Sequence, residues 1–333
     1  MRIGIDAMGG DRAPVEEVKG ALAARQHLAV GDKIVLIGDE SAIRQQLGSA
    51  NGWQEHIDIF HTDQVIAMDD SPVEALRSKP RSSIAMMAQL HAQGDIDACI
   101  SAGNTGACVA AAMMRLRRLQ EVQRPGIAIV APTYHGPVVL CDVGANVNCR
   151  PQHLYQYGVM ASIYSQCVCK IDKPRVGLLS VGEEEAKGNE LVKRTRELYK
   201  KDPQINYIGN VEGRDVFRGV CDVIVCEGFV GNVVLKLMEG MAESVIKALI
   251  REGEAIQDSG AVKQAAKSLM HKWDFNEYGG APLLGIEGIC IICHGASDHR
   301  AFLNAVRVAR TFAAGHVNER ITQQLVQNLG AAS

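Results

Sequence analysis

Aromatic residues are scarce in this sequence, since Phe, Trp and Tyr make up only 5% of its 333 residues. A stacking platform for single-stranded nucleic acid depends on such side chains and is not expected. An excess of one charge is also lacking, because 35 Lys and Arg stand against 38 Asp and Glu, a net charge of −3. This balance argues against the basic surface that duplex nucleic acid requires, and we expect no nucleic-acid partner.

Long hydrophobic runs are missing as well. No apolar stretch reaches the roughly 18 residues that would cross a membrane, and Met1–Asp11 has no signal-peptide core. We therefore expect a cytoplasmic protein, whose ten Cys are free thiols that pack as small apolar side chains.

Signature motifs of several enzyme classes are absent. The sequence has no G-x-S-x-G nucleophile elbow and no H-E-x-x-H metal motif. The run CIICH (Cys290–His294) matches a haem attachment pattern. It is apolar and strand-like, however, so Cys290 and Cys293 would face opposite sides of a sheet. We expect no metal and no cofactor.

Short apolar runs alternate with longer amphipathic stretches, which is typical of a mostly parallel sheet covered by helices on both faces. The predicted strands are Arg2–Asp6, Lys33–Gly38, Ile57–Phe60, Asp97–Ser101, Ile127–Ala131, Val138–Asp142, Arg175–Val181, Ile205–Gly209 and Asp222–Glu227. The predicted helices are Pro14–Ala29, Ser82–Gln93, Thr105–Leu119, Pro151–Lys170, Lys187–Lys201, Val230–Arg251 and Asp298–Leu329. We expect one α/β catalytic domain over residues 1–333, with a helical hairpin inserted at residues 244–275 and interrupted at Gln257–Gly260.

Polar, Gly-rich turns follow the predicted strands. They read AMGGD, SAGNTGA, DVGAN, VGEEEAKGN, VEGRD and EGFVGN along the chain. Ligands of such sheets bind beyond the carboxyl ends of the strands. These turns therefore predict one shared cleft.

The turn SAGNTGA (Ser101–Ala107) joins a strand to a helix and is the strongest anion-site candidate. Gly103 and Gly106 allow close backbone approach, and the helix start supplies free N–H groups. Asn104 and Thr105 add side-chain donors. No G-K-[ST] follows, so this is not a Walker A loop. The alternative is a plain helix cap.

VGEEEAKGN places Lys187 at the predicted start of a helix, beside Asn189. A Lys in that place can hold phosphate as a point charge. A solvated Lys paired with a nearby Glu explains the residue equally well.

Five further candidate residues lie at other strand ends. Glu227 is either an acid–base group or a helix cap. Asp6 can orient a neighbouring group, while Gly9 and Gly10 let the backbone turn under a ligand. His294 is the best-placed imidazole, with a core or capping histidine as the alternative.

Seven blocks of the sequence together resemble the PlsX family, the phosphate acyltransferases of bacterial phospholipid synthesis. They are IDAMGGDRAP, ACISAGNTGA, DVGAN, GEEEAKGNEL, INYIGNVEGRD, EGFVGNVVLK, and YGGAPLLG with HGASD. The blocks follow one another in order from Ile3 to Asp298, so the resemblance covers nearly the whole chain.

The resemblance implies transfer of a long-chain fatty acyl group from acyl carrier protein to inorganic phosphate. The acyl phosphate would serve a membrane glycerol-phosphate acyltransferase. A three-layer α/β/α fold like that of isocitrate and isopropylmalate dehydrogenases is implied too, as is a homodimer. The hairpin would touch an anionic membrane surface and hold the protein at the inner face of the membrane, with dimer or core packing as the alternative.

Phosphate is itself a nucleophile, so the resemblance implies direct attack on the thioester. We expect Lys187 to clamp phosphate, Asn232 to donate a further hydrogen bond and His294 to protonate the leaving thiolate. The other expected phosphate- or substrate-binding residues are Asp6, Gly9, Gly10, Ser101, Gly103, Asn104, Thr105, Gly106, Asn146, Asn189, Glu227 and Gly231.

Three positions depart from the family pattern: Glu227 and Asn148 each replace a common Asp, and Ser180 replaces a common Asn. A mechanism that needs a carboxylate at position 148 is therefore not supported. The acidic carrier protein should meet a basic cluster, either Arg77–Arg81 or Arg115–Arg118, although solvated faces explain both clusters equally well.

Three other functions compete with this one. A phosphotransacetylase acting on short acyl-CoA would use nearly the same chemistry. An NAD-dependent decarboxylating dehydrogenase needs a metal-binding carboxylate cluster, which the sequence does not offer. A non-catalytic membrane scaffold would be insensitive to Lys187→Ala.

Overall fold

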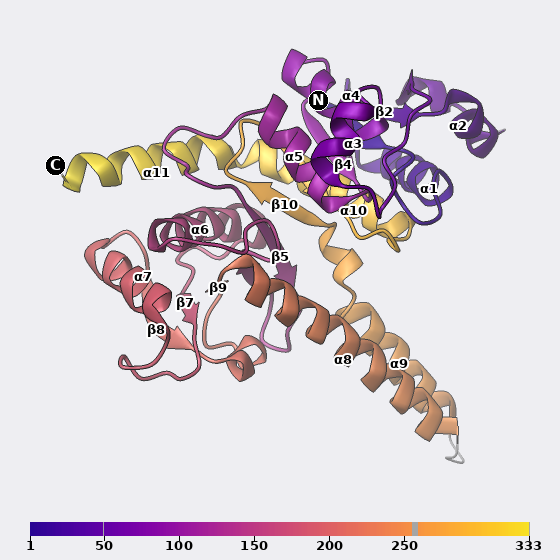
Figure 1. Ribbon diagram of the computed structural model, residues 1–333. Helices are drawn as coiled ribbons and strands as arrows, with labels where there is room; N and C mark the ends of the chain where they lie inside the picture. Colours follow the sequence, from indigo (N-terminus) through magenta and orange to yellow (C-terminus); the bar gives the residue numbers. More distant parts are fainter. Residues whose placement is uncertain (49, 255–258, 333) are drawn as a thin grey trace.

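A computed structural model describes residues 1–48, 50–254 and 259–332 of the chain (Figure 1). Within them, eleven strands form a single sheet in the order β3-β2-β1-β4-β11-β10-β5-β6-β9-β7-β8. The strands are β1 Arg2–Asp6, β2 Lys33–Gly38, β3 Ile57–His61, β4 Ala98–Ser101, β5 Gly126–Ala131, β6 Val138–Cys141, β7 Val176–Leu179, β8 Tyr207–Val211, β9 Val223–Val225, β10 Ala281–Leu284 and β11 Cys290–Ile292.

Helices cover both faces of this sheet. They are α1 Val15–Ala24, α2 Glu40–Leu47, α3 Pro72–Ser78, α4 Ser83–Gln93, α5 Thr105–Arg115, α6 Pro151–Tyr164, α7 Glu190–Lys201, α8 Gly228–Glu254, α9 Ser259–Lys272, α10 His299–Ala314 and α11 Val317–Ala332. One buried cluster packs α1, α2, α6, α7, α10 and α11 on one face of the sheet. The other packs α3, α4, α5 and α8 on the opposite face. The expected α/β/α layering is confirmed.

The sheet contains two parallel blocks that run in opposite directions. Strands β3, β2, β1, β4 and β11 are parallel, and so are β6, β9, β7 and β8. Between the blocks, β10 is antiparallel to both β11 and β5, and β5 is antiparallel to β6. We call the first block with α1–α5 and α10 the N-terminal lobe, and the second with α6 and α7 the middle lobe.

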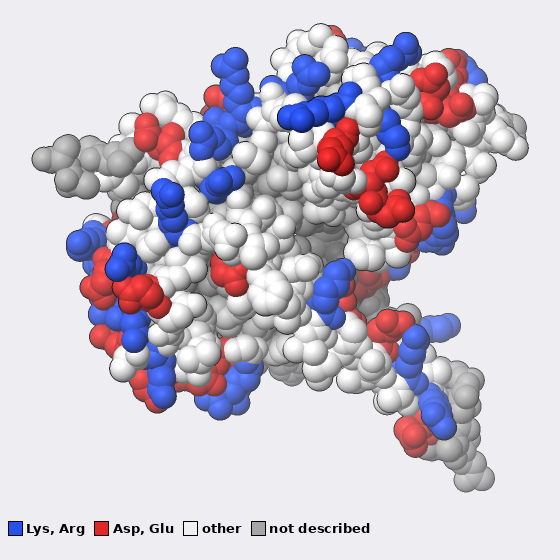
Figure 2. Space-filling model, viewed as in Figure 1, with Lys and Arg blue, Asp and Glu red and all other residues white. Residues whose placement is uncertain are grey.

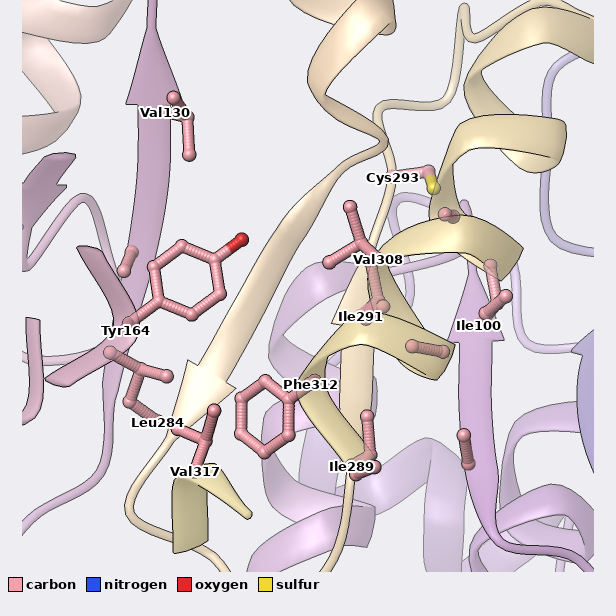
Figure 3. Close-up of a cluster of buried hydrophobic side chains, with 14 of the residues drawn as sticks. Ile100, Val130, Tyr164, Leu284, Ile289, Ile291, Cys293, Val308, Phe312 and Val317 are labelled. Atoms are coloured by element: carbon pink, nitrogen blue, oxygen red, sulfur yellow. The ribbon is translucent and has the colours of Figure 1, made fainter. Parts of the chain in front are cut away.

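The core continues across the junction of the two lobes. In Figure 3, Val308 of α10 lies against Ile291 of β11, with Ile100 on the neighbouring strand β4. Phe312 of α10 faces Tyr164 of α6, with the two ring centroids 6.2 Å apart. All five side chains are less than a tenth exposed. This shared apolar layer joins the lobes into one unit.

Cys290 and Cys293 belong to the buried clusters on opposite faces of the sheet. This placement confirms the predicted alternation along CIICH, and it removes the haem attachment pattern as a functional motif.

The predicted strands lie within two residues of the observed ones, except that β10 was not predicted as a strand. Helices α2 and α3 were also missed, and the last predicted helix divides at Gly315 into α10 and α11. The predicted helix Val230–Arg251 is observed as α8, Gly228–Glu254, so the first helix of the projecting hairpin begins before residue 244, where the insertion was expected to start. Of the predicted break at Gln257–Gly260, the first two residues lie outside the described part of the chain.

Helices α8 and α9 lie side by side and project away from both lobes (Figure 1). Among the helices that the structure describes, none is both long and apolar enough to span a bilayer.

Candidate functional site

The main candidate site is a cavity of about 300 Å³ at the junction of the lobes, which we call the cleft cavity. Figure 2 shows this face of the molecule hollowed between the N-terminal lobe and the start of the hairpin. Its lining comes from both lobes: Met68, Thr105, Ile127, Ile129, Val130, Val143, Asn232, Leu235, Lys236, Glu239, Asn276, Tyr278, Gly280, Ala281, Ile292, Cys293, His294, Gly295, Ser297 and Ala301.

The start of α5 faces the cleft cavity through Thr105. Asn104 caps this helix, because its Oδ1 accepts the N–H of Ala107 at 2.9 Å. Its Nδ2 donates to the carbonyl oxygens of Ala67, Met68 and Asp70, at 3.0–3.2 Å. With its side chain fully engaged, Asn104 positions the loop rather than contacting a ligand. The backbone N–H groups of Thr105 and Gly106 find no partner within the described residues and remain available to an anion.

A buried hydrogen-bond network lies directly beneath this loop. The Ser101 hydroxyl donates to Asp6 Oδ2 at 2.7 Å and accepts the Gly103 N–H at 3.0 Å. Burial raises the pKa of Asp6, while hydrogen bonds from Ser83, Ser101 and the Met8 N–H act in the opposite direction. Asp6 and Ser101 are completely buried, so they hold the loop and do not reach the cavity.

Two glycines let the first turn of the chain lie on this network. A Cβ on Gly9 would stand 2.5 Å from Asp6 Oδ2 and 2.6 Å from the Gly103 nitrogen. A Cβ on Gly10 would stand 2.3 Å from Glu17 Oε1. Only glycine fits at position 9, where the Gly103 backbone lies close, whereas at position 10 the close atom is the end of the Glu17 side chain. Both residues bring backbone, not side chains, to the edge of the site.

Glu17 is a buried carboxyl that the sequence analysis did not single out. Its Oε1 accepts the Gly10 N–H at 3.1 Å, and its Oε2 has no hydrogen-bond partner among the described atoms. Burial, reinforced by the charge of Asp6, raises the pKa of Glu17 to about 7. The spacing of Glu17 seven residues after Gly10 gave no sign of this contact.

His294 lines the cleft cavity on the loop that follows β11. Its Nδ1 accepts the Ala296 N–H at 3.2 Å, so the proton of the neutral ring lies on Nε2. The Ser297 hydroxyl accepts the His294 N–H at 3.1 Å, and Asp11 N–H donates to the Gly295 carbonyl at 2.8 Å. These bonds fix the imidazole and join its loop to the first turn of the chain.

The start of α8 brings the other wall of the cavity. Glu227 caps this helix, since its carboxylate accepts the N–H groups of Phe229 and Val230 at 2.7 and 3.0 Å. Gly231 lies against the backbone, where a Cβ would stand 1.9 Å from the Asp142 carbonyl oxygen. This packing sets Asn232 at the cleft cavity.

The turn DVGAN after β6 is held together by the Asp142 carboxylate. It accepts the N–H groups of Ile127, Gly144, Ala145 and Asn146 at 2.8–3.2 Å. The Asn146 Nδ2 donates to the Pro125 carbonyl at 2.6 Å. Asn146 therefore braces this turn and is not among the residues that line the cavity.

A second cavity of about 330 Å³, the edge cavity, lies at the carboxyl ends of β7 and β9. Its lining is Leu154, Leu179, Ser180, Val181, Gly188, Asn189, Leu191, Val192, Gly213, Cys226, Glu227 and Val230. Asn189 caps α7, because its Oδ1 accepts the Val192 N–H at 3.0 Å. Since α7 begins at Glu190, Lys187 lies in the loop before the helix, which corrects the predicted helix start.

The structure thus divides the expected site residues into two groups. Thr105, Asn232 and His294 line the cleft cavity, and the residues around Gly9, Gly10 and Gly103 support it from below. Asn189 and Glu227 line the edge cavity instead, and Lys187 lies beside Asn189 in sequence. Thr105 of the expected anion site Ser101–Ala107 therefore lines a different cavity from Asn189, the neighbour of the expected phosphate clamp Lys187.

The sequence analysis missed Lys236, which lines the cleft cavity. A signal was present, because Lys236 follows Asn232 by four residues in a predicted helix and so lies on the same face. In the part of the chain that the structure describes, no three His, Cys, Asp or Glu side chains are grouped to hold a metal ion.

Comparison with known proteins identifies the family of the chain. The family described as "Fatty acid synthesis protein" matches residues 1–320. The phosphate acyltransferase of Trichlorobacter lovleyi is 44% identical, with 99% of this chain and 96% of the relative covered. That of Geotalea uraniireducens is 45% identical, with 98% and 95% covered.

Among solved structures, a phosphotransacetylase from Streptococcus pyogenes is similar with a TM-score of 0.65 at 14% identity, covering 94% of each chain. A putative 4-hydroxythreonine-4-phosphate dehydrogenase from Salmonella typhimurium reaches 0.50 at 13% identity, covering 93% of this chain and 99% of its own. These likenesses concern the fold alone. The family match and the near-complete relatives show that the chain belongs to the fatty acid synthesis protein family, together with these phosphate acyltransferases.

Proposed function

We propose that the chain transfers a fatty acyl group from acyl carrier protein to inorganic phosphate, and that the transfer takes place in the cleft cavity. The observation that carries this proposal is the mixed lining of that one cavity. Hydrogen-bond donors come from the start of α5, Asn232 and His294, while apolar side chains come from Ile127, Ile129, Val143 and Leu235. An acyl thioester that meets phosphate needs both kinds of surface.

The reaction requires no covalent enzyme intermediate. An unprotonated phosphate oxygen attacks the thioester carbonyl carbon, a C–O bond forms, and the carbonyl oxygen becomes an oxyanion. The free N–H groups of Thr105 and Gly106 are donors of the kind that stabilise this charge. The C–S bond then breaks, which yields acyl phosphate and the carrier thiolate.

The His294 Nε2–H is suited to donate a hydrogen bond to the departing sulfur, because Nδ1 already accepts the Ala296 N–H. The thiolate takes its proton from the monoprotonated phosphate group of the product, which is a stronger acid than the thiol, so the step balances.

The test is phosphate-dependent release of thiol from palmitoyl-acyl carrier protein, with the acyl phosphate trapped by hydroxylamine. We expect release only with phosphate present. Asn232→Ala should lower kcat/KM by about 10- to 100-fold if it contacts the reacting groups. Asn206→Ala is the matched control, since Asn206 donates to the Lys173 carbonyl far from the cavity, at the edge of the middle lobe.

Release from acetyl-CoA but not from the carrier protein would instead identify a phosphotransacetylase. Release from neither substrate by a folded protein would reject acyl transfer altogether.

We also propose that the chain forms a homodimer through α8. Phe229, Val233, Leu237, Met241 and Val245 follow one another at intervals of four residues, and each is 52–62% exposed. A stripe of large apolar side chains on a projecting helix is the kind of surface that a second copy covers.

Peripheral association with an anionic membrane is a further proposal for the hairpin. Lys267 and Lys272 are exposed on α9, and basic side chains of this kind interact with anionic lipid heads. Sedimentation with vesicles that contain anionic lipid, compared with neutral vesicles, would test it.

A further inference from the structure

The cleft cavity is lined by one cation among the residues that the structure describes. Lys236 reaches it from α8, one helical turn after Asn232. Residues four apart lie on the same face of a helix, so the Asn232 amide and the Lys236 ammonium point to the same side. Opposite them lies Thr105 at the start of α5, where N–H groups are unpaired.

Lys236 is held in place by a neighbour that also lines the cavity. Its Nζ lies 2.8 Å from Glu239 Oε2, with the two side chains 48% and 33% exposed. Figure 2 shows positive and negative side chains together at the rim of the hollow, over the first half of α8. Ion pairs this exposed are weak, so an incoming anion can displace the carboxylate.

Phosphate is a stronger partner for Lys236 than Glu239 is. At neutral pH it carries between one and two negative charges, and it has more acceptor oxygens than a carboxylate. The free N–H groups at the start of α5 can bind further oxygens of the same ion. Lys187, in contrast, lies before α7, next to a residue that lines the edge cavity.

We infer that Lys236 binds the phosphate that attacks the thioester, and that Glu239 competes with this phosphate for the Lys236 ammonium. The inference deepens the proposed function and rests on it. Lys236 neutralises charge on the non-attacking oxygens and fixes the ion beside the α5 start. Glu239 orients the ammonium while the cavity holds no anion.

The test compares KM for phosphate and KM for palmitoyl-acyl carrier protein in single variants. Lys236→Met retains the length and helix propensity of the side chain. It should raise KM for phosphate by about tenfold or more, with KM for the acyl substrate changed by less than about twofold. Glu239→Gln should lower KM for phosphate, because the competing charge is removed while the shape is retained.

The matched controls are Lys247→Met and Glu243→Gln on the same helix. These two residues form an ion pair at 2.5 Å, and neither lines the cleft cavity. Both controls should leave KM for phosphate unchanged. If the Lys236–Glu239 pair had only a structural role, Lys236→Met and Glu239→Gln would change KM for phosphate and KM for palmitoyl-acyl carrier protein in the same direction. That result would overturn the inference.

Titration calorimetry with inorganic phosphate alone separates this inference from the proposed function. Weaker phosphate binding by Lys236→Met supports the assignment, whereas equal affinity for the wild type and the variant overturns it. If the wild type binds phosphate through Lys236 but releases no thiol, the proposed function fails and the anion site stands.

Discussion

Glu17 is a buried carboxyl group with one oxygen that lacks a hydrogen-bond partner among the described groups. It is almost fully buried, and only one of its two oxygens accepts a hydrogen bond among the described groups. Its pKa is raised from an ordinary value of 4.5 to about 7, first by burial and then by the charge of Asp6. The folded protein therefore holds a proton at Glu17 that the unfolded chain has already released.

This raised pKa predicts how stability depends on pH. Between about pH 4.5 and 7 the folded state binds more protons than the unfolded state, so the free energy of unfolding falls as pH rises. Glu17→Gln stays neutral and still accepts the Gly10 N–H. It should be more stable than the wild type at pH 8 and lose that advantage at pH 4. The difference is on the order of 3 kcal/mol at most, measured by urea unfolding.

Glu16 provides a control of opposite sign on the same helix. Burial raises its pKa, but the His299 N–H and the charges of Arg12 and Lys19 outweigh burial and lower it overall. The Glu16 carboxylate therefore stabilises the folded protein at pH values above its pKa in the unfolded chain. This stabilisation is lost as the pH falls. Glu16→Gln should cost more stability at pH 7 than at pH 3, and a profile like that of Glu17→Gln would contradict this account.

At the residue scale, the sequence predicted capping positions better than contacts. Asn104 and Glu227 cap their helices, as the capping alternatives stated for them predicted, because the capping pattern is local. Asn189, expected to bind phosphate within a helix that starts at Lys187, instead caps α7. The buried contact between Gly10 and Glu17 depends on how α1 returns over the first turn, which no local pattern encodes. Lys236 was missed because its role depends on a cavity formed by distant segments.

The start of α8 is the element whose packing sets the site most directly. Gly231→Ala should push this helix away from the Asp142 carbonyl, since the added Cβ would stand 1.9 Å from that oxygen. We expect a loss of about 1–3 kcal/mol in stability, together with reduced activity, because Asn232 moves with the helix. Urea unfolding and the thiol-release assay would measure both effects.

Gly240→Ala on the same helix is the matched control. A Cβ there would meet nothing within 4 Å, so the helix propensity of Ala should stabilise the protein by about 1 kcal/mol. Equal effects of the two substitutions would refute the packing argument.

The two basic clusters differ in their place relative to the cleft cavity. Arg81 follows α3 and lies next to the end of β3. Its carbonyl oxygen accepts a hydrogen bond from the hydroxyl of Thr62, the residue directly after β3. Arg117 lies beyond the far end of α5, about 16 Å of helix away from the end that lines the cavity. We therefore propose that acyl carrier protein docks at Arg77–Arg81.

Charge reversal distinguishes the two clusters. Arg81→Glu should raise KM for palmitoyl-acyl carrier protein, with the effect reduced at high salt. Arg117→Glu should leave this KM unchanged. The opposite pattern in steady-state kinetics would place the docking surface at the other cluster.

At the element scale, the sequence predicted strands that are buried on both faces, because their apolar runs are continuous. It missed β10, because this strand contains Pro282 and is flanked by glycines typical of turns, Gly279 and Gly280 before it and Gly285 after it. It missed α3, which has only seven residues. Short elements next to Pro and Gly carry too few positions for a period to be visible.

For the whole molecule, the shared cleft was predicted from a rule for parallel sheets, yet the two parallel blocks run in opposite directions. Six steps separate β1 from β9 in the sheet. At about 20–25° of twist per step, the strands rotate by roughly 120–150° over this distance. The twist nearly cancels the reversal, so Thr105 after β4, Val143 after β6 and His294 after β11 can line one cleft cavity. The turn after β7 lines the separate edge cavity instead, so the predicted single cleft is divided in two.

The homodimer proposed above rests on the apolar stripe of α8. Leu237→Glu combined with Met241→Glu should shift the protein to a monomer in analytical ultracentrifugation, because charges would replace apolar contacts across the two-fold axis. Val30→Glu is the control, since Val30 is fully exposed but lies in the loop before β2. A dimer that survives the double substitution would locate the interface elsewhere.

The order of the strands in the sheet differs from their order along the chain. β4 lies between β1 and β11, and Cys99 of β4 is paired with Cys290, almost two hundred residues later. During synthesis on the ribosome, β4 must therefore wait with an unpaired edge until most of the chain has emerged. The strands of the second parallel block, which are consecutive in the chain, can pair by then. The block of the sheet that is translated first is consequently the one that is completed last.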